Sequence, residues 1–267
     1  MSEDSRGQLT GSAAEIYEAF FVPALFQEWA PQVADAAAIA PGHAVLDVAC
    51  GTGVLAREVA GRVGQAGRVV GLDRNEGMLD VARRSEAAVE WQAGRAEAMP
   101  FEDGAFDVVV SQFGLMFFDD RPAALREMWR VLRPGGHLAV AVWDELAHSP
   151  GYAAMAELLL RLFGSRVAEE LRAPFSLGDA AALRGLCGEA GIPQASVRTL
   201  QGTARFPSLE AWVRTDVKGW TLAGMLDDAQ YARLQQEAVA ALAPQVRPDG
   251  TVAFAISAHV VTAAKDA

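Results

Sequence analysis

A glycine-rich segment, VLDVACGTG at residues 45–53, holds the residues whose types and spacing could bind a nucleotide-like ligand. Gly51 and Gly53 stand directly after an apolar run, where glycine allows the backbone to approach a ligand closely. The helix that we expect to begin near Val54 points unpaired amides at the same place. Asp47 adds a carboxylate at the end of the apolar run. The segment therefore predicts a ligand crevice at the carboxyl end of a buried strand.

The carboxylates of this segment favour one of two kinds of ligand. The spacing Gly51-x-Gly53-x-x-Ala56 fits a dinucleotide fingerprint, but Asp47 would repel a pyrophosphate in a low dielectric. S-adenosylmethionine carries an ammonium and a sulfonium and no phosphate, so a carboxylate suits its charge. Asp73, 20 residues after Gly53, is placed to accept hydrogen bonds from the ribose of either ligand. The residues favour S-adenosylmethionine and leave a nicotinamide dinucleotide as the alternative.

A regular alternation of strands and helices must position this crevice. Apolar, β-branched runs predict strands at residues 44–49, 68–73, 88–92, 106–111 and 137–143. Helical spacing follows at 54–63, around Met78, and from Pro122 to about Leu132, where Pro134-Gly135-Gly136 is expected to stop the helix. This alternation with short connections implies right-handed crossovers and a parallel sheet.

The chain after residue 150 predicts a looser arrangement. Helices are expected near 152–163, 179–190, 208–217 and 227–242, and strands near 195–206 and 251–264. Because the segment 208–242 lies between two strands, we expect it to leave the sheet and cover the active site. The predicted fold class is α/β: a Rossmann-like, open, mostly parallel seven-stranded sheet with helices on both faces and a helical cap.

We expect one domain over residues 1–267, with a helical lid segment at the N-terminus and a variable region on the substrate side. The boundaries are 1–40 for the lid, 44–145 for the cofactor-binding core, 151–250 for the variable region and 251–264 for the final strand.

Composition and charge exclude several other classes of protein. Of the 267 residues, 51% are apolar, which is incompatible with disorder, and no apolar run reaches the roughly 18 residues of a membrane span. The net charge of −11 repels phosphate backbones, so nucleic acid is not an expected partner. The polar N-terminus lacks a signal-peptide core. We expect a cytoplasmic protein in which Cys50 and Cys187 stay reduced.

Four motifs in order along the chain resemble class I S-adenosylmethionine-dependent methyltransferases. They are VLDVACGTG, VVGLD, AEAMPFEDGAFDVVVSQFGLMFF and LREMWRVLRPGGHLAVAVW. The resemblance is strongest to the ubiquinone/menaquinone biosynthesis methyltransferases, the methyltransferase type 11 branch, and covers residues 15 to about 145. It implies in-line transfer of a methyl group to an O, N or C nucleophile of a small, hydrophobic or planar molecule, with S-adenosylhomocysteine as product. It does not identify the acceptor.

The resemblance also assigns cofactor contacts to individual positions. The glycine turn would surround the methionine part, and Asp73 at the end of the second strand would hold the ribose. Arg74 and Met78 would flank the adenine, and Ala96 would offer it a backbone amide. The end of the fourth strand would lie near the methyl group. The expected cofactor-binding residues are Tyr17, Trp29, Asp47, Ala49, Cys50, Gly51, Gly53, Asp73, Arg74, Met78, Arg95, Ala96, Glu97, Ser111, Gln112 and Phe113. Tyr17 and Trp29 are included because the N-terminal segment closes over the cofactor in related enzymes.

Two departures from the family pattern affect this assignment. Arg95 stands where the family usually has Asp, and Arg offers no acceptor to the adenine amino group. Glu97 or a backbone carbonyl could accept instead, or Arg95 could stack on the ring. Ala49 replaces a frequent Gly, which is a milder change.

A general base is optional in methyl transfer, because alignment of the nucleophile matters most. His148 and Asp144 follow the fifth strand on the crevice face and are the candidates for that role, and no metal ligand set is expected. Two other functions stay open at this point. One is an NAD(P)-dependent oxidoreductase, and the other is a non-catalytic accessory protein, which Arg95 would support.

Overall fold

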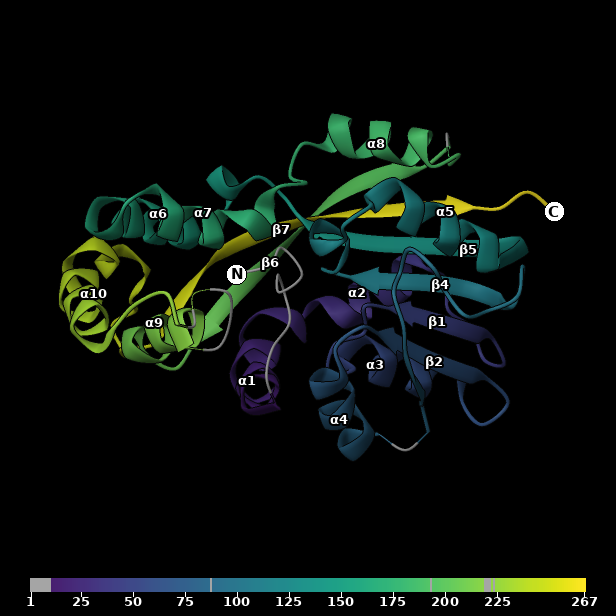
Figure 1. Cartoon of the computed structure of the whole chain (residues 1–267), viewed down its shortest axis with the longest axis horizontal. Helices are drawn as coiled ribbons and strands as arrows, with labels where there is room; N and C mark the ends of the chain where they lie inside the picture. Colours follow the sequence, from purple (N-terminus) through teal and green to yellow (C-terminus); the bar gives the residue numbers. More distant parts are fainter. Residues whose placement is uncertain (1–10, 87, 193, 219–221, 223) are drawn as a thin grey trace.

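The alternating runs of the sequence form a single sheet. The computed structural model describes residues 11–86, 88–192, 194–218, 222 and 224–267, and in them seven strands take the order β3-β2-β1-β4-β5-β7-β6 (Figure 1). The strands are β1 (Ala44–Val48), β2 (Arg68–Asp73), β3 (Glu90–Ala93), β4 (Phe106–Gln112), β5 (Leu132–Trp143), β6 (Ser196–Phe206) and β7 (Val252–Ala264). β7 runs antiparallel to β5 and β6, and the other pairs are parallel. The expected α/β class and mostly parallel sheet are confirmed.

Helices connect the strands and cover the sheet. They are α1 (Gly11–Ile16), α2 (Trp29–Ala36), α3 (Val54–Val63), α4 (Glu76–Ser85), α5 (Arg121–Val131), α6 (Pro150–Phe163), α7 (Ser165–Arg172), α8 (Ala180–Glu189), α9 (Leu209–Lys218) and α10 (Asp228–Ala241). A π-helix, η2 (Tyr17–Phe26), joins α1 to α2, and short 3-10 turns include η5 (Ala173–Phe175). Because β2 and β5 lie on opposite sides of the β1–β4 pair, right-handed crossovers place α3 and α5 on opposite faces.

The junction of α5 and β5 differs from the expectation. The helix ends at Val131 and the strand begins at Leu132, so Pro134-Gly135-Gly136 lies inside β5 and does not separate it from the helix. The helix ends close to the expected Leu132, but the strand begins earlier than expected, since proline at position 134 restricts Arg133 to extended backbone. The pairing of β4 with β5 shifts register at this irregular start.

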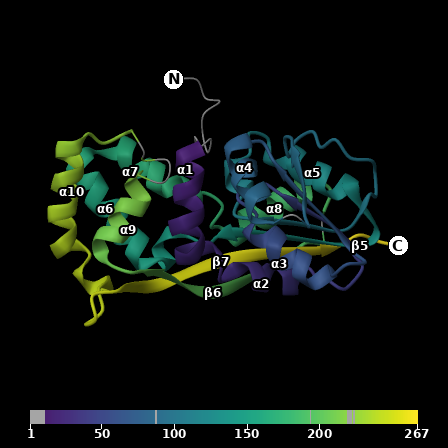
Figure 2. The same ribbon diagram turned by 90° about the horizontal axis from the view of Figure 1, so that it is seen from below.

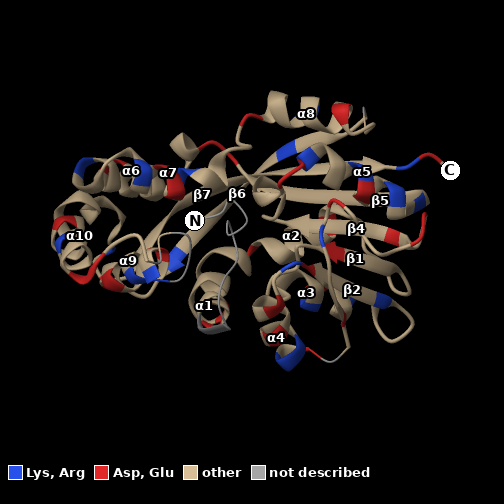
Figure 3. Ribbon diagram, viewed as in Figure 1, with Lys and Arg blue, Asp and Glu red and all other residues tan. Residues whose placement is uncertain are grey.

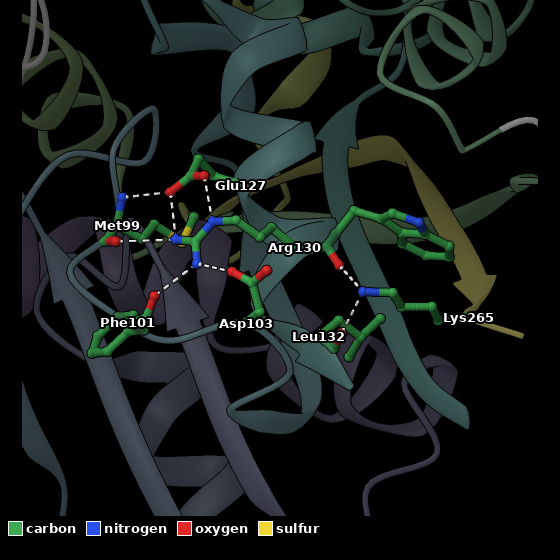
Figure 4. A network of polar contacts seen from close by, with 8 residues as sticks. Met99, Phe101, Asp103, Glu127, Arg130, Leu132 and Lys265 are labelled. Carbon is green, nitrogen blue, oxygen red and sulfur yellow. Dashed lines mark hydrogen bonds and ion pairs between the residues drawn. The ribbon is translucent and has the colours of Figure 1, made fainter. Parts of the chain in front are cut away.

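Arg130 and Lys265 hold this junction in place (Figure 4). The Arg130 guanidinium donates to both carboxylate oxygens of Glu127, at 2.7 and 2.8 Å, and to the main-chain oxygens of Met99 and Phe101. Lys265, just after β7, donates to two main-chain oxygens at the end of α5, at 2.6 and 2.7 Å. A cation there satisfies carbonyls that the helix leaves unpaired. The loop before β4, α5 and the chain after β7 are therefore tied together.

The late helices do not cover the ligand crevice, which corrects the expectation for residues 208–242. Beyond the pair formed by Trp143 and Ala258, β6 and β7 continue together without β5. This two-stranded extension carries α9 and α10 away from the sheet, where they pack with α6 and α7 at one end of the molecule (Figure 2). Helix α7 was not expected from the sequence.

Charged residues are spread over both ends of the molecule. Figure 3 shows acidic and basic positions interspersed on the helices, while the strands β1 and β4 are mostly uncharged. Within the described part of the chain, no helix has the length and apolar character needed to cross a bilayer. Residues 1–10 of the expected lid segment lie outside the described residues.

Candidate active site

The strand order reverses between β1 and β4, and strained backbone marks the ends of both strands. Ala49, directly after β1, has φ of 57°, and Phe113, directly after β4, also has φ of 57°. Residues other than glycine rarely adopt this left-handed conformation, and such strain often accompanies functional sites. The reversal opens a crevice at the carboxyl ends of the strands, as in other open α/β sheets. The two strained residues flank that crevice.

The glycine turn is closed by hydrogen bonds to the neighbouring strand. The amide of Gly51 donates to Asp73 Oδ2 at 2.8 Å, and the amide of Cys50 donates to the carbonyl of Leu72 at 3.1 Å. Asp73 Oδ1 accepts from the amide of Asn75, which caps α4. The ends of β1 and β2 therefore form one rigid unit, with the N-terminus of α3 beside it.

A cavity of about 870 Å³, counting space open to solvent, lies at this point, and we call it the central cavity. Expected site residues that line it are Tyr17, Ala49, Gly51, Asp73, Arg74, Met78, Ala96, Glu97, Gln112 and Phe113. The remaining lining residues were not predicted as site residues: Phe26, Leu72, Gly94, Gly114, Phe117 and Phe118. The structure thus brings together side chains from η2, the strand ends and the segment after β4.

The unpredicted lining residues share a position that the sequence could have indicated. Leu72 precedes Asp73 at the end of β2, and Gly94 follows β3 at the same edge of the sheet. Gly114, Phe117 and Phe118 continue the segment after β4 that already holds Phe113. Phe26 could not be predicted in this way, because it comes from the other end of the π-helix that supplies Tyr17. Gln112 Nε2 donates to the Phe26 carbonyl at 3.1 Å and ties η2 to β4.

Asp47 is buried in the middle of the sheet and is not among the residues that line the central cavity, although Ala49, two residues later, is. Asp47 pairs with Gly71 of β2 and Val110 of β4, and its side chain is only 1% exposed. Neither carboxylate oxygen has a hydrogen-bond partner among the described residues. Burial, then the charge of Asp73, raises the pKa of this carboxyl well above its ordinary value. An orphaned buried carboxyl costs stability, so the position suits a group that binds a hydrogen-bond donor or a cation.

Two further groups in the cavity have raised pKa values. Burial raises the pKa of the Asp73 carboxyl, although the amides of Asn75 and Gly51 oppose the shift. Burial, followed by the negative charges of nearby carboxylates, raises the pKa of the Tyr17 hydroxyl, so it stays protonated. Tyr17 therefore serves as a hydrogen-bond donor at neutral pH and not as a base.

Several expected cofactor residues do not line the central cavity. Trp29 is fully buried, and its ring packs edge to face on Phe113. The same ring occupies the space where a side chain at Gly202 of β6 would lie. Gly53 faces the Trp91 ring. Cys50 and Ser111 are buried behind the surface, and burial raises the pKa of the Cys50 thiol well above its ordinary value, which makes the thiol unreactive.

Arg95 lies outside the lining and pairs with acidic neighbours. Its guanidinium is 2.6 Å from Asp119 Oδ2 and 3.6 Å from Glu97 Oε2. Glu97 lines the cavity, and its Oε1 accepts from the amide of Asp119 at 3.0 Å. Glu97 therefore contributes a carboxylate to the cavity lining, and Arg95 does not belong to that lining.

Asp144 and His148 line a different hollow, on the side of α8. Asp144 Oδ2 accepts from Ser257 Oγ at 2.7 Å and contacts His148 Nδ1 at 2.8 Å, and Asp144 Oδ1 lies 3.1 Å from His259 Nε2. Despite burial, these hydrogen bonds lower the pKa of the Asp144 carboxyl. The pair does not border the central cavity, so a role as general base remains a prediction without geometric support.

The contact between Ala49 and Gly114 leads to a prediction about stability. A Cβ added at Gly114 would lie 2.6 Å from the Ala49 Cβ. Ala49→Gly is expected to stabilise the fold by about 1 kcal/mol, because it removes a left-handed alanine. Gly114→Ala should destabilise the parent chain by about 2 kcal/mol and cost much less in the Ala49→Gly background. Urea unfolding of the four variants measures this coupling, and additive effects would contradict it.

Comparisons with known proteins agree with this geometry. Residues 20–192 match the ubiE/COQ5 methyltransferase family. A demethylmenaquinone methyltransferase of Renibacterium salmoninarum is 40% identical over 136 residues, which is 51% of this chain and 56% of the relative. A ubiquinone/menaquinone biosynthesis C-methyltransferase UbiE of Xanthomonas campestris is 34% identical over 194 residues, which is 67% of this chain and 77% of the relative.

The similarity to the curated relatives is partial in length. The chain spans 56% of the Renibacterium protein and 61% of a UbiE protein of Hahella chejuensis, which is 38% identical over 151 residues, or 53% of this chain. Among solved structures, the YcgJ protein of Bacillus subtilis superposes with a TM-score of 0.61 at 17% identity, covering 90% of this chain and 99% of that one. A Haemonchus contortus phosphoethanolamine N-methyltransferase 2, in complex with S-adenosylhomocysteine, gives 0.62 at 18% identity, covering 97% and 58%. At such low sequence identities, these superpositions show that the fold is shared and nothing more.

Proposed function

The chain belongs to the ubiE/COQ5 methyltransferase family, whose fold is that of S-adenosylmethionine-dependent methyltransferases, and from this premise we propose that it methylates a small molecule. The observation that carries the proposal is Asp47, a buried carboxyl at the end of β1 whose two oxygens lack partners. It lies two residues before Ala49, which lines the central cavity together with Gly51 and Asp73. S-adenosylmethionine supplies the methyl group as a cation, which an orphaned carboxylate suits.

The residues present fit this cofactor. Asp47 would hold the methionine ammonium, and the second acid, Asp73, would accept from ribose hydroxyls with lone pairs that the Gly51 and Asn75 amides leave free. Met78 and Leu72 give the adenine apolar contacts, and Glu97 can accept a hydrogen bond from its amino group. These assignments support S-adenosylmethionine over a dinucleotide, because Asp73 in the lining and Asp47 behind it disfavour a pyrophosphate, while Arg74 of the lining pairs with Asp119 at 3.4 Å.

The chain's own residues would bind and align the acceptor and keep water away. Phe26, Phe113 and Phe118 form an apolar wall, which excludes water from a developing transfer. Tyr17 offers a protonated hydroxyl, and Gln112 contributes a side-chain carbonyl that has no partner among the described residues. In this proposal catalysis comes from alignment of the acceptor with the cofactor, without a dedicated base.

The names of the curated relatives suggest which acceptors to assay. The curated relatives are named for ubiquinone/menaquinone biosynthesis, so the precursors of these quinones are the first acceptors to assay. The family match ends at residue 192, however, and β6, α9, α10 and β7 follow it. Because the family match does not extend over these elements, the acceptor of this chain can differ from that of its relatives.

Thermal unfolding with added ligands tests the cofactor assignment. S-adenosylhomocysteine at a hundred times its dissociation constant should add about 2.7 kcal/mol of stability, which raises the Tm by roughly 5 to 10 °C at this chain length. NAD and NADP at the same concentration should leave the Tm unchanged, since Asp47 and Asp73 repel phosphates. A shift with a dinucleotide and none with S-adenosylhomocysteine would refute the proposal.

A further inference from the structure

A second cavity, which we call the side cavity, lies beyond the aromatic wall of the central cavity. Its volume is about 400 Å³ when space open to solvent is counted. Its walls come from elements that are far apart in the sequence. Residues that line it include Leu25 of η2, Trp143 of β5, Tyr152 of α6, Phe175 of η5, Asp216 of α9 and Ile256 of β7.

The two cavities are separated by one aromatic layer. Leu25 lines the side cavity, and the next residue, Phe26, lines the central cavity. The Trp143 ring stacks on the Phe113 ring with centroids 3.7 Å apart and planes 12° apart. The two cavities thus lie on either side of the same buried rings. The side cavity is therefore placed to hold the part of an acceptor that does not react.

The Asp216 carboxyl is the unusual feature of the side cavity. Its side chain is 4% exposed, and Oδ1 accepts only a long hydrogen bond from the Tyr152 hydroxyl, at 3.4 Å. Oδ2 has no partner among the described residues. Burial raises the pKa of this carboxyl to about 8, although the nearby Trp212 indole and Tyr152 hydroxyl oppose the shift. A buried carboxyl so poorly compensated reduces stability, which is typical of a ligand-binding position.

The other lining groups indicate the charge of the ligand. Three aromatic rings surround the cavity, from Trp143, Tyr152 and Phe175, and Glu170 adds a second carboxyl to the lining. No lysine or arginine lines it within the described residues. Aromatic faces and carboxylates both attract cations, and their combination is used to bind organic ammonium groups. The Asp216 carboxyl can turn about its last side-chain bond at little cost, so either oxygen can meet such a group.

We propose that the side cavity binds an amine attached to an apolar body, with its ammonium paired to Asp216 and enclosed by the aromatic rings. Given the proposed methyl transfer, on which this step rests, the amine belongs to the methyl acceptor and anchors it beside the cofactor. Binding of the ammonium form requires Asp216 to lose its proton, which leaves to the solvent. All the residues responsible lie on elements outside the glycine turn.

Calorimetric titration with three matched probes tests this site. The probes are 2-phenylethylamine, the neutral 2-phenylethanol and the anionic 3-phenylpropionate, each with and without saturating S-adenosylhomocysteine. In the parent chain the amine should bind at least tenfold tighter than the alcohol, and the anion should bind weakest. At pH 7 the amine should release close to one proton, read from the dependence of the binding heat on the buffer.

Variants on α9 separate the role of Asp216 from general charge effects. Asp216→Leu and Asp216→Asn should each remove the tenfold preference and the proton release. Glu210→Gln removes one negative charge from the exposed face of the same helix and should leave both unchanged. If Asp216→Leu fails to fold, Asp216→Asn gives the same reading with nearly the same side-chain shape. S-adenosylhomocysteine should bind all variants alike.

Three results would overturn the assignment. They are an alcohol that binds as tightly as the amine, an amine preference that survives both Asp216 variants, and amine binding without proton release. Failure of the proposed function would give a different result, because S-adenosylhomocysteine would then not bind the parent chain. The amine titration without S-adenosylhomocysteine would still test the side cavity.

Discussion

Asp47→Asn is expected to weaken S-adenosylhomocysteine binding by roughly 30-fold while raising the Tm of the ligand-free protein. The loss corresponds to about 2 kcal/mol, the usual contribution of a hydrogen bond to a charged group. The gain in Tm follows from burial: Asp47 has two unpartnered oxygens and a raised pKa, and an amide in its place carries no charge to desolvate. Calorimetric titration and thermal unfolding measure the two effects.

The gain in stability should depend on pH. Because the folded-state pKa of Asp47 is raised, the unfolded chain loses this proton first as pH increases. The stability of the parent therefore falls as pH rises above the ordinary carboxyl pKa, and Asp47→Asn avoids that loss. The Tm difference should be larger at pH 7 than at pH 4.

Asp216→Asn is the matched control for this experiment. It also removes a buried carboxyl with a raised pKa, so the Tm should rise, but Asp216 lies outside the central cavity. Its affinity for S-adenosylhomocysteine should equal that of the parent. If Asp47→Asn bound the ligand as tightly as the control does, the assignment of Asp47 to the methionine ammonium would be wrong.

Gly53→Ala is expected to destabilise the fold by about 3 kcal/mol. Gly53 caps the start of α3 with φ of 90°, and an added Cβ would lie 2.4 Å from the Trp91 ring. The left-handed backbone contributes about 1 kcal/mol of this cost, and overpacking against a fixed ring contributes about 2. Chemical denaturation measures the change in the free energy of unfolding.

Two other glycines separate these contributions. Gly191, just after α8, has φ of 81° in a C-terminal helix cap and open space around its would-be Cβ, so Gly191→Ala should cost only about 1 kcal/mol. Gly51, with φ of 56°, also has open space, but it lines the central cavity, so Gly51→Ala should cost a similar amount and in addition weaken S-adenosylhomocysteine binding. Equal losses for Gly53→Ala and Gly191→Ala would show that Trp91 does not restrict position 53.

The surroundings of these glycines explain why the sequence predicted the glycine turn but not the role of each glycine. The spacing of Gly51 and Gly53 after an apolar run indicates a tight turn before a helix, since both features are local. Which glycine faces the ligand depends on Trp91, a residue of β3 that approaches the turn only when the sheet forms. For the same reason Trp29 was predicted at the cofactor and lies in the core, where Gly202 of β6 leaves room for it.

The sequence by itself determined the strands β1 to β5, the helices between them, the glycine turn and the two carboxylates Asp47 and Asp73. Hydrophobic periodicity and turn residues act over short stretches of chain, so a reader of the sequence can find them. Only the tertiary structure decided where the late helices lie, because the β6–β7 extension that carries them depends on pairing between residues far apart in the chain. The same holds for the side cavity: Asp216 meets Tyr152 and Trp143 through packing of α9 against distant elements, and no local pattern encodes that contact.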